Sequence, residues 1–337
     1  MRDRADNLPG MLMNALWFVV GLLTVIAGAE VMVRGGAEVA ARLGISPIII
    51  GLTVVSIGTS MPELAVGVVS AADGSGALAV GNIAGTNVVN ILLILGLSAL
   101  LVPLALAMRT IRFELPMMAV AALLFWGLAA DGNLSRLDGG ILVTAAVGYT
   151  AAVIWSARRE SRAIAAEFAS EFAPEPVATT TEVRRRTATH VAMTVGGIVV
   201  VVIGADWLVD GAVGMARQFG VTDALIGLTV VAIGTSAPEL VTTVMTTLRG
   251  DRDIAIGNLI GSSIYNILLI LGITCLVPAG GLALTEGLVR IDIPVMVVVG
   301  LACIPIFLSG RRVSRMEGGM MVAAYLGYLA FVLSTQT

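Results

Sequence analysis

The chain has 337 residues, of which 57% are hydrophobic and 13% charged, with a formal net charge of -3 and a mean hydropathy of +0.97. Roughly a quarter of the residues in a soluble globular domain are charged, so the composition excludes that class and indicates a chain whose solvent is the lipid bilayer. With two cysteines and one histidine, the sequence offers neither a disulfide framework nor a zinc cluster.

Apolar runs close to the roughly 20 residues that span a bilayer recur along the whole chain. Each run is continuous, whereas the strands of a membrane barrel alternate in polarity over about 10 residues. We therefore predict an all-α polytopic membrane protein with ten transmembrane helices. In chain order, the predicted spans lie at about 12–33, 46–70, 78–101, 114–130, 138–156, 190–212, 222–247, 254–277, 290–308 and 317–335.

The arginines predict how these spans are oriented. All 20 basic residues are arginines, and fifteen of them fall on the side of the membrane opposite the two termini. Because short cytoplasmic loops are enriched in basic residues, we predict that both termini are extracytoplasmic, in a multi-pass protein of the cell inner (plasma) membrane. The charged segment 157–189 is then a cytoplasmic linker, in which a solvent-exposed helix is compatible with the sequence up to about residue 172.

The two halves of the sequence repeat each other. Residues 51–55 recur as 227–231, and residues 90–96 recur as 266–272, with a separation of 176 positions in both cases. Each half contains five predicted spans, and because five is odd, the second copy enters the membrane with the opposite orientation. The predicted organisation is a first five-helix repeat at 1–156, the linker at 157–189 and a second, inverted five-helix repeat at 190–337.

Each repeat carries one Gly-Thr-Ser-x-Pro-Glu motif in its second span, at 58–63 and 234–239. The motif glutamates, Glu63 and Glu239, lie in the middle of these spans, where an ionised carboxylate costs about 2.5–3.5 kcal/mol. The second, third, seventh and eighth predicted spans contain no arginine, so a bound cation or a proton must neutralise the two carboxylates. The motif prolines should kink both helices and free backbone carbonyls one turn earlier.

The polar residues around the motifs share helical faces. Hydroxyls at positions 56, 59 and 60 face the same way as Glu63, because residues three, four and seven apart lie on one side of a helix. The second repeat has Ala232 in place of Ser56, so this position can offer only a backbone oxygen in both halves. The third and eighth spans each add a hydroxyl and an amide. The candidate ion-binding residues are Glu63, Glu239, Thr59, Thr235, Ser60, Ser236, Asn90, Asn266, Thr86, Ser262, Ser56 and Ala232.

A cage of carboxylate, carbonyl and hydroxyl oxygens without sulfur or imidazole suits hard cations such as Ca²⁺ or Na⁺. The alternative is that the hydroxyls bond to their own backbone and each proline only bends a core helix. We assign Asn82 and Asn258 as caps or hinge groups rather than ligands. For Glu30 and Asp206, snorkelling toward the membrane surface, a gate contact and ion binding all stay open.

With these motifs, the chain resembles the cation/Ca²⁺ exchanger (CaCA) superfamily, in the branch of prokaryotic sodium/calcium exchangers and their potassium-dependent relatives. The resemblance covers essentially all ten predicted spans and is carried by 58–63, 81–96 and their second copies. It implies that Glu63 and Glu239 are central to Ca²⁺ binding. For Ca²⁺ it also implies the backbone oxygens of Thr59 and Thr235. For Na⁺ it implies additional ligands from Ser60, Ser236, Thr86, Ser262 and the carbonyls of Ser56 and Ala232. Asn90 and Asn266 would complete the site.

The resemblance also bears on the co-transported ion. Relatives often have an aspartate at the position of Asn266, and in the potassium-dependent branch this carboxylate matters for potassium, so the asparagine here argues against potassium coupling. Two carboxylates balance one Ca²⁺, whereas three sodium ions would leave a net charge of +1. The family resemblance and this charge count together indicate an electrogenic exchange.

We therefore predict a secondary active antiporter that exchanges Na⁺ for Ca²⁺ by alternating access, independently of K⁺. One alternative is H⁺/Ca²⁺ antiport, because protonation would also neutralise the carboxylates. A cation channel is another, since channels also use rings of oxygens. The prediction includes no enzymatic activity, no cofactor and no nucleic-acid partner. The expected partners are the transported ions Ca²⁺ and Na⁺ and the lipid bilayer, and the expected state is a monomer.

Overall fold

The computed structural model describes residues 8–43, 47–106, 108, 110–171, 180–219, 232–308 and 310–336. Most of these residues are helical, as expected for apolar segments that must satisfy their backbone hydrogen bonds without water. The helices, with π-helical segments written η, are α2 (Leu8–Leu43), α3 (Pro47–Ile50), η1 (Gly51–Val55), α4 (Ser56–Thr59), α5 (Met61–Ala72), α6 (Gly76–Val88), η2 (Val89–Leu95), α7 (Gly96–Leu101), η3 (Thr110–Glu114), α8 (Leu115–Leu128), α9 (Arg136–Glu171), α10 (Thr180–Gln218), α12 (Ala232–Thr235), α13 (Ala237–Arg249), α14 (Arg252–Tyr265), η5 (Asn266–Leu271), α15 (Gly272–Leu276), η6 (Leu288–Asp292), α16 (Ile293–Leu308) and α17 (Arg315–Gln336).

Seven of the described helical stretches are long and apolar enough to cross a membrane. The bent pair formed by Gly51–Thr59 and Met61–Ala72 makes an eighth, so the fold is that of a helical multi-pass membrane protein. Of the other two predicted spans, the one at about 222–247 lies partly outside the described residues. The last one corresponds to α17, which has 22 residues. The count of ten spans and the division into two repeats stay predictions.

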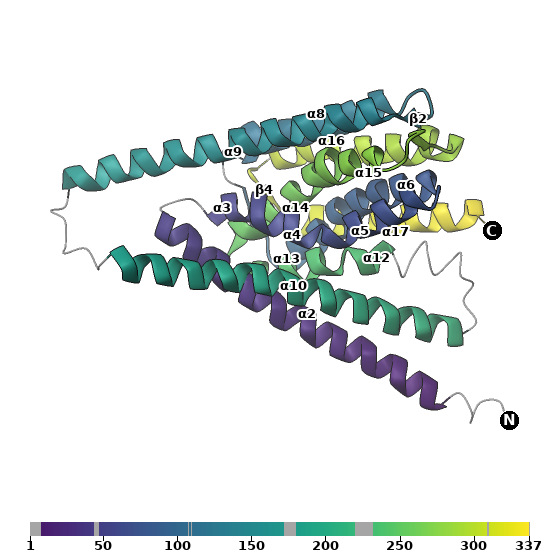
Figure 1. Ribbon diagram of the computed structural model, residues 1–337, viewed down its shortest axis with the longest axis horizontal. Helices are drawn as coiled ribbons and strands as arrows, with labels where there is room; N and C mark the ends of the chain where they lie inside the picture. The colour runs from purple at the N-terminus through teal and green to yellow at the C-terminus, as the bar shows by residue number, and fades with distance from the viewer. Residues whose placement is uncertain are drawn as a thin grey trace.

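Two long helices, α2 and α10, lie side by side along one flank of the bundle, in the lower part of Figure 1. Glycines at seven-residue intervals line their contact, and a Cβ atom at any of them would come within about 3 Å of the partner helix backbone. These glycines are Gly21, Gly28 and Gly35 on α2 and Gly197, Gly204 and Gly211 on α10. A spacing of seven keeps small residues on one helical face. The sequence analysis predicted both helices but missed this glycine pattern.

The centre of the bundle is formed by the predicted third and eighth spans. In Arg252–Leu276, 83% of the most apolar window is buried inside the protein, and in Gly76–Leu101 the buried share is 72%. Apolar side chains from both halves of the sequence, such as Ile94 and Ile264, belong to one hydrophobic core around them. The broken helix of α4 and α5 and the shorter α13 pack against this centre (Figure 1). The motif residues therefore lie deep in the protein.

Two short antiparallel strand pairs connect loops of the two sequence halves. Strand β1 (Leu104–Ala105) pairs with β4 (Arg312–Val313), and β2 (Asn133–Leu134) pairs with β3 (Leu282–Ala283). The all-α prediction missed these pairs, because a two-residue strand is too short to leave an alternating pattern in the sequence. Each pair ties a loop of the first half to a loop of the second half on the same side of the bundle.

The ends of the long helices agree with the prediction that the linker lies on the side of the bundle opposite the two chain termini. In Figure 1, α2 begins and α17 ends at the right of the molecule, whereas α9 ends and α10 begins at the left. Both of the latter helices extend into the predicted linker, α9 as far as Glu171 and α10 from Thr180. Residues 172–179 of that linker lie outside the described residues. The linker thus connects two helices on the side opposite the chain ends.

Glu30 forms an ion-pair contact between the long helix pair and the central bundle. Its carboxylate pairs with Arg34 on the same helix and with Arg249 at the end of α13. The Glu30 side chain is 22% exposed, whereas both motif glutamates are fully buried. The ion pairs join two helices, and a gating role of Glu30 stays a prediction. The repeat counterparts of Glu30 and Arg249 are Asp206 and Asp73, two acids that cannot pair in this way.

Candidate functional site

Both Gly-Thr-Ser-x-Pro-Glu motifs interrupt their helix at the serine. Ser60 separates α4 from α5 with φ -84° and ψ 9°, and Ser236 separates α12 from α13 with φ -85° and ψ 4°. The helices on either side of Ser60 are bent by 47°, which confirms the kink predicted there. The proline follows in the first turn of the new helix, where its missing N–H costs no hydrogen bond. Glu63 and Glu239 also lie in these first turns, where the helix dipole favours an anion.

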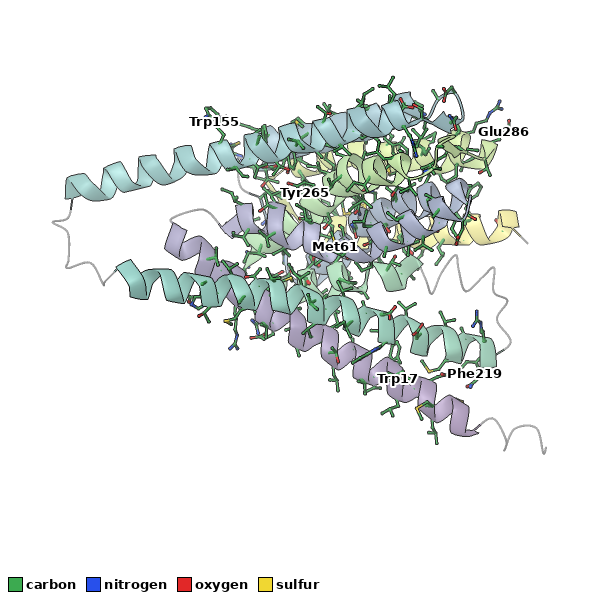
Figure 2. The ribbon with its side chains drawn as sticks, in the orientation of Figure 1. Trp17, Met61, Trp155, Phe219, Tyr265 and Glu286 are labelled. Atoms are coloured by element: carbon green, nitrogen blue, oxygen red, sulfur yellow. The ribbon has the colours of Figure 1, made fainter. Side chains whose placement is uncertain are left out.

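The two helix breaks meet inside the protein. The Ser60 hydroxyl donates a hydrogen bond of 3.4 Å to Oε1 of Glu239, and the Glu63 carboxylate lies close to both Thr235 and Glu239. Both glutamates are 0% exposed. Met61, which follows Ser60, lies near the middle of the bundle in Figure 2. The structure therefore brings the two motifs, 176 positions apart in the sequence, into one place.

Several buried polar groups in this region have no hydrogen-bond partner. An unsatisfied buried group costs about 1–3 kcal/mol, and a charged one more. Helix α5 packs against η5, which carries one of the asparagines, and α13 packs against η2, which carries the other. A hard cation would supply the missing interaction partner for the oxygen atoms among these groups, because such cations are bound by oxygen ligands. The unpartnered groups are both carboxylate oxygens of Glu63, Oε2 of Glu239, the hydroxyl of Thr86 and the amide groups of Asn90 and Asn266.

Two other intramembrane acids, Glu114 and Asp292, differ from the motif glutamates, because each of them has a tyrosine donor. The Tyr149 hydroxyl donates to Oε2 of Glu114 at 2.7 Å, and the Tyr328 hydroxyl donates to Oδ1 of Asp292 at 3.1 Å. The two pairs occupy corresponding places in the two sequence halves. Their hydrogen bonds indicate a structural role for Glu114 and Asp292, in contrast to Glu63 and Glu239, which retain unpartnered carboxylate oxygens.

Asn90 and Asn266 stand at the start of π-helical segments. Asn90 is the second residue of η2, and Asn266 is the first residue of η5. A π-helical turn widens the helix and occurs often at functional sites. Both asparagines are 0% exposed. The repeated sequence at 90–96 and 266–272 predicted a helix here, but helical periodicity alone could not predict the π-helical form.

Residues Ser56 and Ser262 connect the first motif helix to α14. The Ser262 hydroxyl donates to the backbone oxygen of Ser56 at 3.4 Å, and it also lies 3.4 Å from Oγ1 of Thr59. The Ser56 hydroxyl itself donates to the backbone oxygen of Gly51 at 2.5 Å. Only the carbonyl of Ser56 therefore faces the site. The corresponding residue Ala232 begins α12, and its side chain lies outside the described residues.

Asn258, predicted from the sequence to be a cap or hinge group, contacts a candidate ion-binding residue. The structure places it inside α14, where it is 0% exposed. Its Oδ1 accepts a hydrogen bond of 3.2 Å from Thr59, and its Nδ2 donates one of 3.2 Å to Thr243 on α13. The signal was present in the spacing, because Asn258, Ser262 and Asn266 are four residues apart and share one face.

We predict that Asn258→Ala weakens Ca²⁺ binding by about tenfold, because groups that orient metal ligands typically contribute 10–100-fold to affinity. Titration of the purified protein with Ca²⁺ measures this. Asn87→Ala is the matched control, since Asn87 is also buried but its amide donates to Ile83 of its own helix at 2.9 Å. Equal affinities for the two variants would contradict the positioning role of Asn258.

Among the described residues, no group of three or more histidine, cysteine, aspartate or glutamate side chains could hold a metal ion. Cys275 and Cys303 are free and buried. The motif region thus combines two carboxylates with neutral oxygens. Fewer charged ligands generally mean weaker Ca²⁺ binding.

Comparison with known proteins reveals similarity over nearly the whole chain. The family described as sodium/calcium exchanger protein matches residues 13–155 and 189–334. The putative antiporter CaxA of Alkalimonas amylolytica is 35% identical over 330 residues, which cover 96% of this chain and 100% of that protein. The sodium/calcium exchanger MaX1 of Methanosarcina acetivorans is 31% identical, with coverage of 94% and 97%.

Solved structures extend the likeness to the fold. A structure of the sodium-calcium exchanger NCX_Mj, soaked with 2.5 mM Na⁺ and 1 mM Sr²⁺, superposes with a TM-score of 0.79 at 25% sequence identity. The superposition covers 94% of this chain and 98% of that one. The arrangement of helices described above is therefore shared with that protein over almost its full length.

Proposed function

Because the chain belongs to the sodium/calcium exchanger family, we propose that it is a secondary active antiporter that exchanges Na⁺ for Ca²⁺ across a membrane by alternating access. The observation that carries the proposal is the pair of fully buried carboxylates, Glu63 and Glu239. They lie close together and retain unpartnered oxygens. Two like charges in a dry site repel each other. A divalent cation bound between them would offset this repulsion and give the unpartnered oxygens a ligand.

The proposed Ca²⁺ ligands are Glu63 and Glu239 together with the backbone oxygens of Thr59 and Thr235. Sodium ions use the same carboxylates with additional neutral oxygens, so the two ions compete for one site instead of binding together. The additional oxygens are proposed to come from Ser60, Ser236, Thr86, Ser262, Asn90, Asn266 and the carbonyls of Ser56 and Ala232. Oxygen-only coordination is typical for both ions.

Competition for shared carboxylates explains why the exchange is coupled. With the two carboxylates, one Ca²⁺ gives a neutral complex, whereas three sodium ions give a complex of charge +1, so we propose that exchange is electrogenic. We also propose that the exchange is independent of K⁺. The basis is Asn266, because this position carries an amide instead of a third carboxylate.

Alternating access is proposed to come from movement of α2 and α10 relative to the central bundle. The glycine contact makes these two helices one tightly packed unit, whereas the motif residues belong to other helices. In the proposed orientation, both termini face outward from the inner membrane and the linker between α9 and α10 is cytoplasmic. One chain contains both halves of the site, so a monomer is the proposed functional unit.

The decisive experiment measures uptake of radioactive calcium into proteoliposomes loaded with sodium. We expect rapid Ca²⁺ uptake when the sodium gradient points outward, and we expect this uptake to generate a membrane potential. The uptake rate should stay the same when K⁺ replaces choline on both sides. Uptake driven equally well by a proton gradient would instead favour H⁺/Ca²⁺ antiport. Uptake without any counter-ion would indicate a cation channel. Either of these results would overturn the proposed coupling.

A further inference from the structure

Helix α13 carries a polar face that the proposed ion site does not use. Beyond Glu239, every residue on the face of this glutamate is a threonine, because positions three, four, seven and eight residues later share its side of the helix. We call this set the threonine face. It consists of Thr242, Thr243, Thr246 and Thr247, each of which is at most 1% exposed. The face runs for about 12 Å, at about 1.5 Å per residue, from the ion site to the end of α13.

The hydroxyls of the threonine face are only partly satisfied by the protein. Thr246 donates to the carbonyl of Thr242 at 2.8 Å, and Thr243 accepts from Asn258 at 3.2 Å. The hydroxyls of Thr242 and Thr247 have no partner. Burying a hydroxyl without a partner is unfavourable, so these groups indicate an environment that water or a cation visits.

A neighbouring helix adds a further hydroxyl of the same kind. Ser98 on α7 is 0% exposed and its hydroxyl has no partner. Helix α7 packs against α13. Ser98 is the repeat counterpart of Thr274, whose side chain lies against Gly67, the counterpart of Thr243. If the repeat relation holds for this pair, Ser98 faces Thr243 of the threonine face, and the packing of α7 against α13 agrees with that placement.

A surface cavity lies where the threonine face ends. It has a volume of about 310 Å³ and is lined by Ala105 and residues 250–254, which follow α13 directly. Asp251, Arg252 and Asp253 contribute its charged groups. The backbone N–H of Asp251 donates to the carbonyl of Thr246 at 2.9 Å, so a residue that lines the cavity directly contacts the last turn of the threonine face. Two aspartates and one arginine give the lining a net negative charge, which attracts cations from solution.

The other repeat lacks this arrangement. The counterparts of the threonine face on α5 are Val66, Gly67, Ser70 and Ala71, with a single hydroxyl in four positions. Because the repeats are predicted to be inverted, α5 and α13 lead from the ion site toward opposite membrane surfaces. Of the two described motif helices α5 and α13, only α13 therefore carries the row of four threonines, and it ends on the side where α9 ends and α10 begins.

We infer that the threonine face, with Ser98, is the half-pathway through which partly dehydrated cations move between the Glu63/Glu239 site and the cavity at residues 250–254. Hydroxyl oxygens can take the place of water molecules in the hydration shell of a hard cation, because such cations prefer oxygen ligands. The face thus selects small cations during passage and lowers the barrier on this side of the site. This inference rests on the proposed exchange function for the identity of the cations.

Access can be tested without transport by labelling cysteines with a membrane-impermeant, cationic thiol reagent. The background is Cys275→Ala with Cys303→Ala, which removes both native thiols. Thr246→Cys lies on the threonine face, and Met245→Cys, its neighbour in the chain, is the matched control on the opposite face of α13. We expect Thr246→Cys to react at least about tenfold faster from the side of the 157–189 linker, and Ca²⁺ to slow this reaction. Equal rates for the two variants would overturn the inference.

Transport gives a second, independent measure. Thr242→Val keeps the shape of the side chain but removes the hydroxyl, so we expect sodium-driven Ca²⁺ uptake to fall about tenfold, with Thr242→Ser close to the original rate. Full activity of Thr242→Val would count against the pathway. The two proposals fail in different ways: fast labelling of Thr246→Cys without any exchange would refute the exchange function alone, whereas exchange with equal labelling would refute the pathway alone.

Discussion

Replacing Glu63 or Glu239 with glutamine should reduce sodium-driven Ca²⁺ uptake to the level of empty vesicles. Glutamine has nearly the same shape, so the bundle is retained, but one of the two charges that balance Ca²⁺ is lost. Both glutamates are 0% exposed, and a charge interaction at such a site is much stronger than in water. We expect a decrease of at least about a hundredfold, equivalent to about 2.7 kcal/mol.

A carboxylate outside the site provides the control for these variants. Glu286 has a side chain that is 76% exposed and pairs only with Arg290 one turn later, at 3.2 Å. Such exposed ion pairs contribute about 0–1 kcal/mol, so Glu286→Gln should transport at the original rate. Thermal unfolding in detergent verifies that all variants are folded. Substantial exchange in either Glu63→Gln or Glu239→Gln would remove the central observation behind the proposed function.

A leucine at Gly197 should separate α2 from α10 and abolish transport. A Cβ atom at this position would lie 2.5 Å from the backbone nitrogen of Met32, a distance at which the two helices must move apart. Overpacking of this kind typically costs about 1–3 kcal/mol and sometimes more. We expect a lower melting temperature in detergent together with loss of Ca²⁺ uptake, since the two helices no longer move as one unit.

The preceding residue supplies a matched control. A Cβ atom at Gly196 would meet nothing within 4 Å, and Gly196 is exposed on the surface of α10. Gly196→Leu should therefore be neutral or stabilising by up to about 1 kcal/mol, because leucine favours a helix over glycine. A similar loss of stability in both variants would mean that helix propensity or insertion, and not the contact between α2 and α10, explains the effect.

The sequence was most informative where one physical requirement acts on consecutive residues. Continuous apolar runs predicted the helices, and proline with glutamate in each motif predicted the break at Ser60 and the burial of Glu63 and Glu239. The internal repeat predicted that the two motifs belong together, and the structure brings them side by side. Whether these residues bind ions stays a prediction, and so does the division into two repeats.

Features that depend on contacts between distant segments were not predictable in the same way. Asn258 bonds to Thr59 and Thr243 from different helices, and a residue in a single sequence gives no direct sign of partners so far away. The π-helical form of 266–271 is equally hidden, because its residues are ordinary helix formers. The glycines of α2 and α10 were visible as a seven-residue interval, but only the structure identifies the helix that they contact.

The contact of Glu30 with Arg249 has a consequence for the balance between the two end states of transport. In an inverted repeat with two identical halves, the forms open to either side would have the same free energy and be equally populated. This ion pair breaks the equality, because its counterparts Asp206 and Asp73 are both acidic. A partly exposed pair contributes about 0–1 kcal/mol, which is at most about a fivefold preference. In the proposed alternating-access cycle, the pair therefore contributes to the stability of the form in which α2 is held against the end of α13, and we expect this contribution to fade as added salt screens the pair.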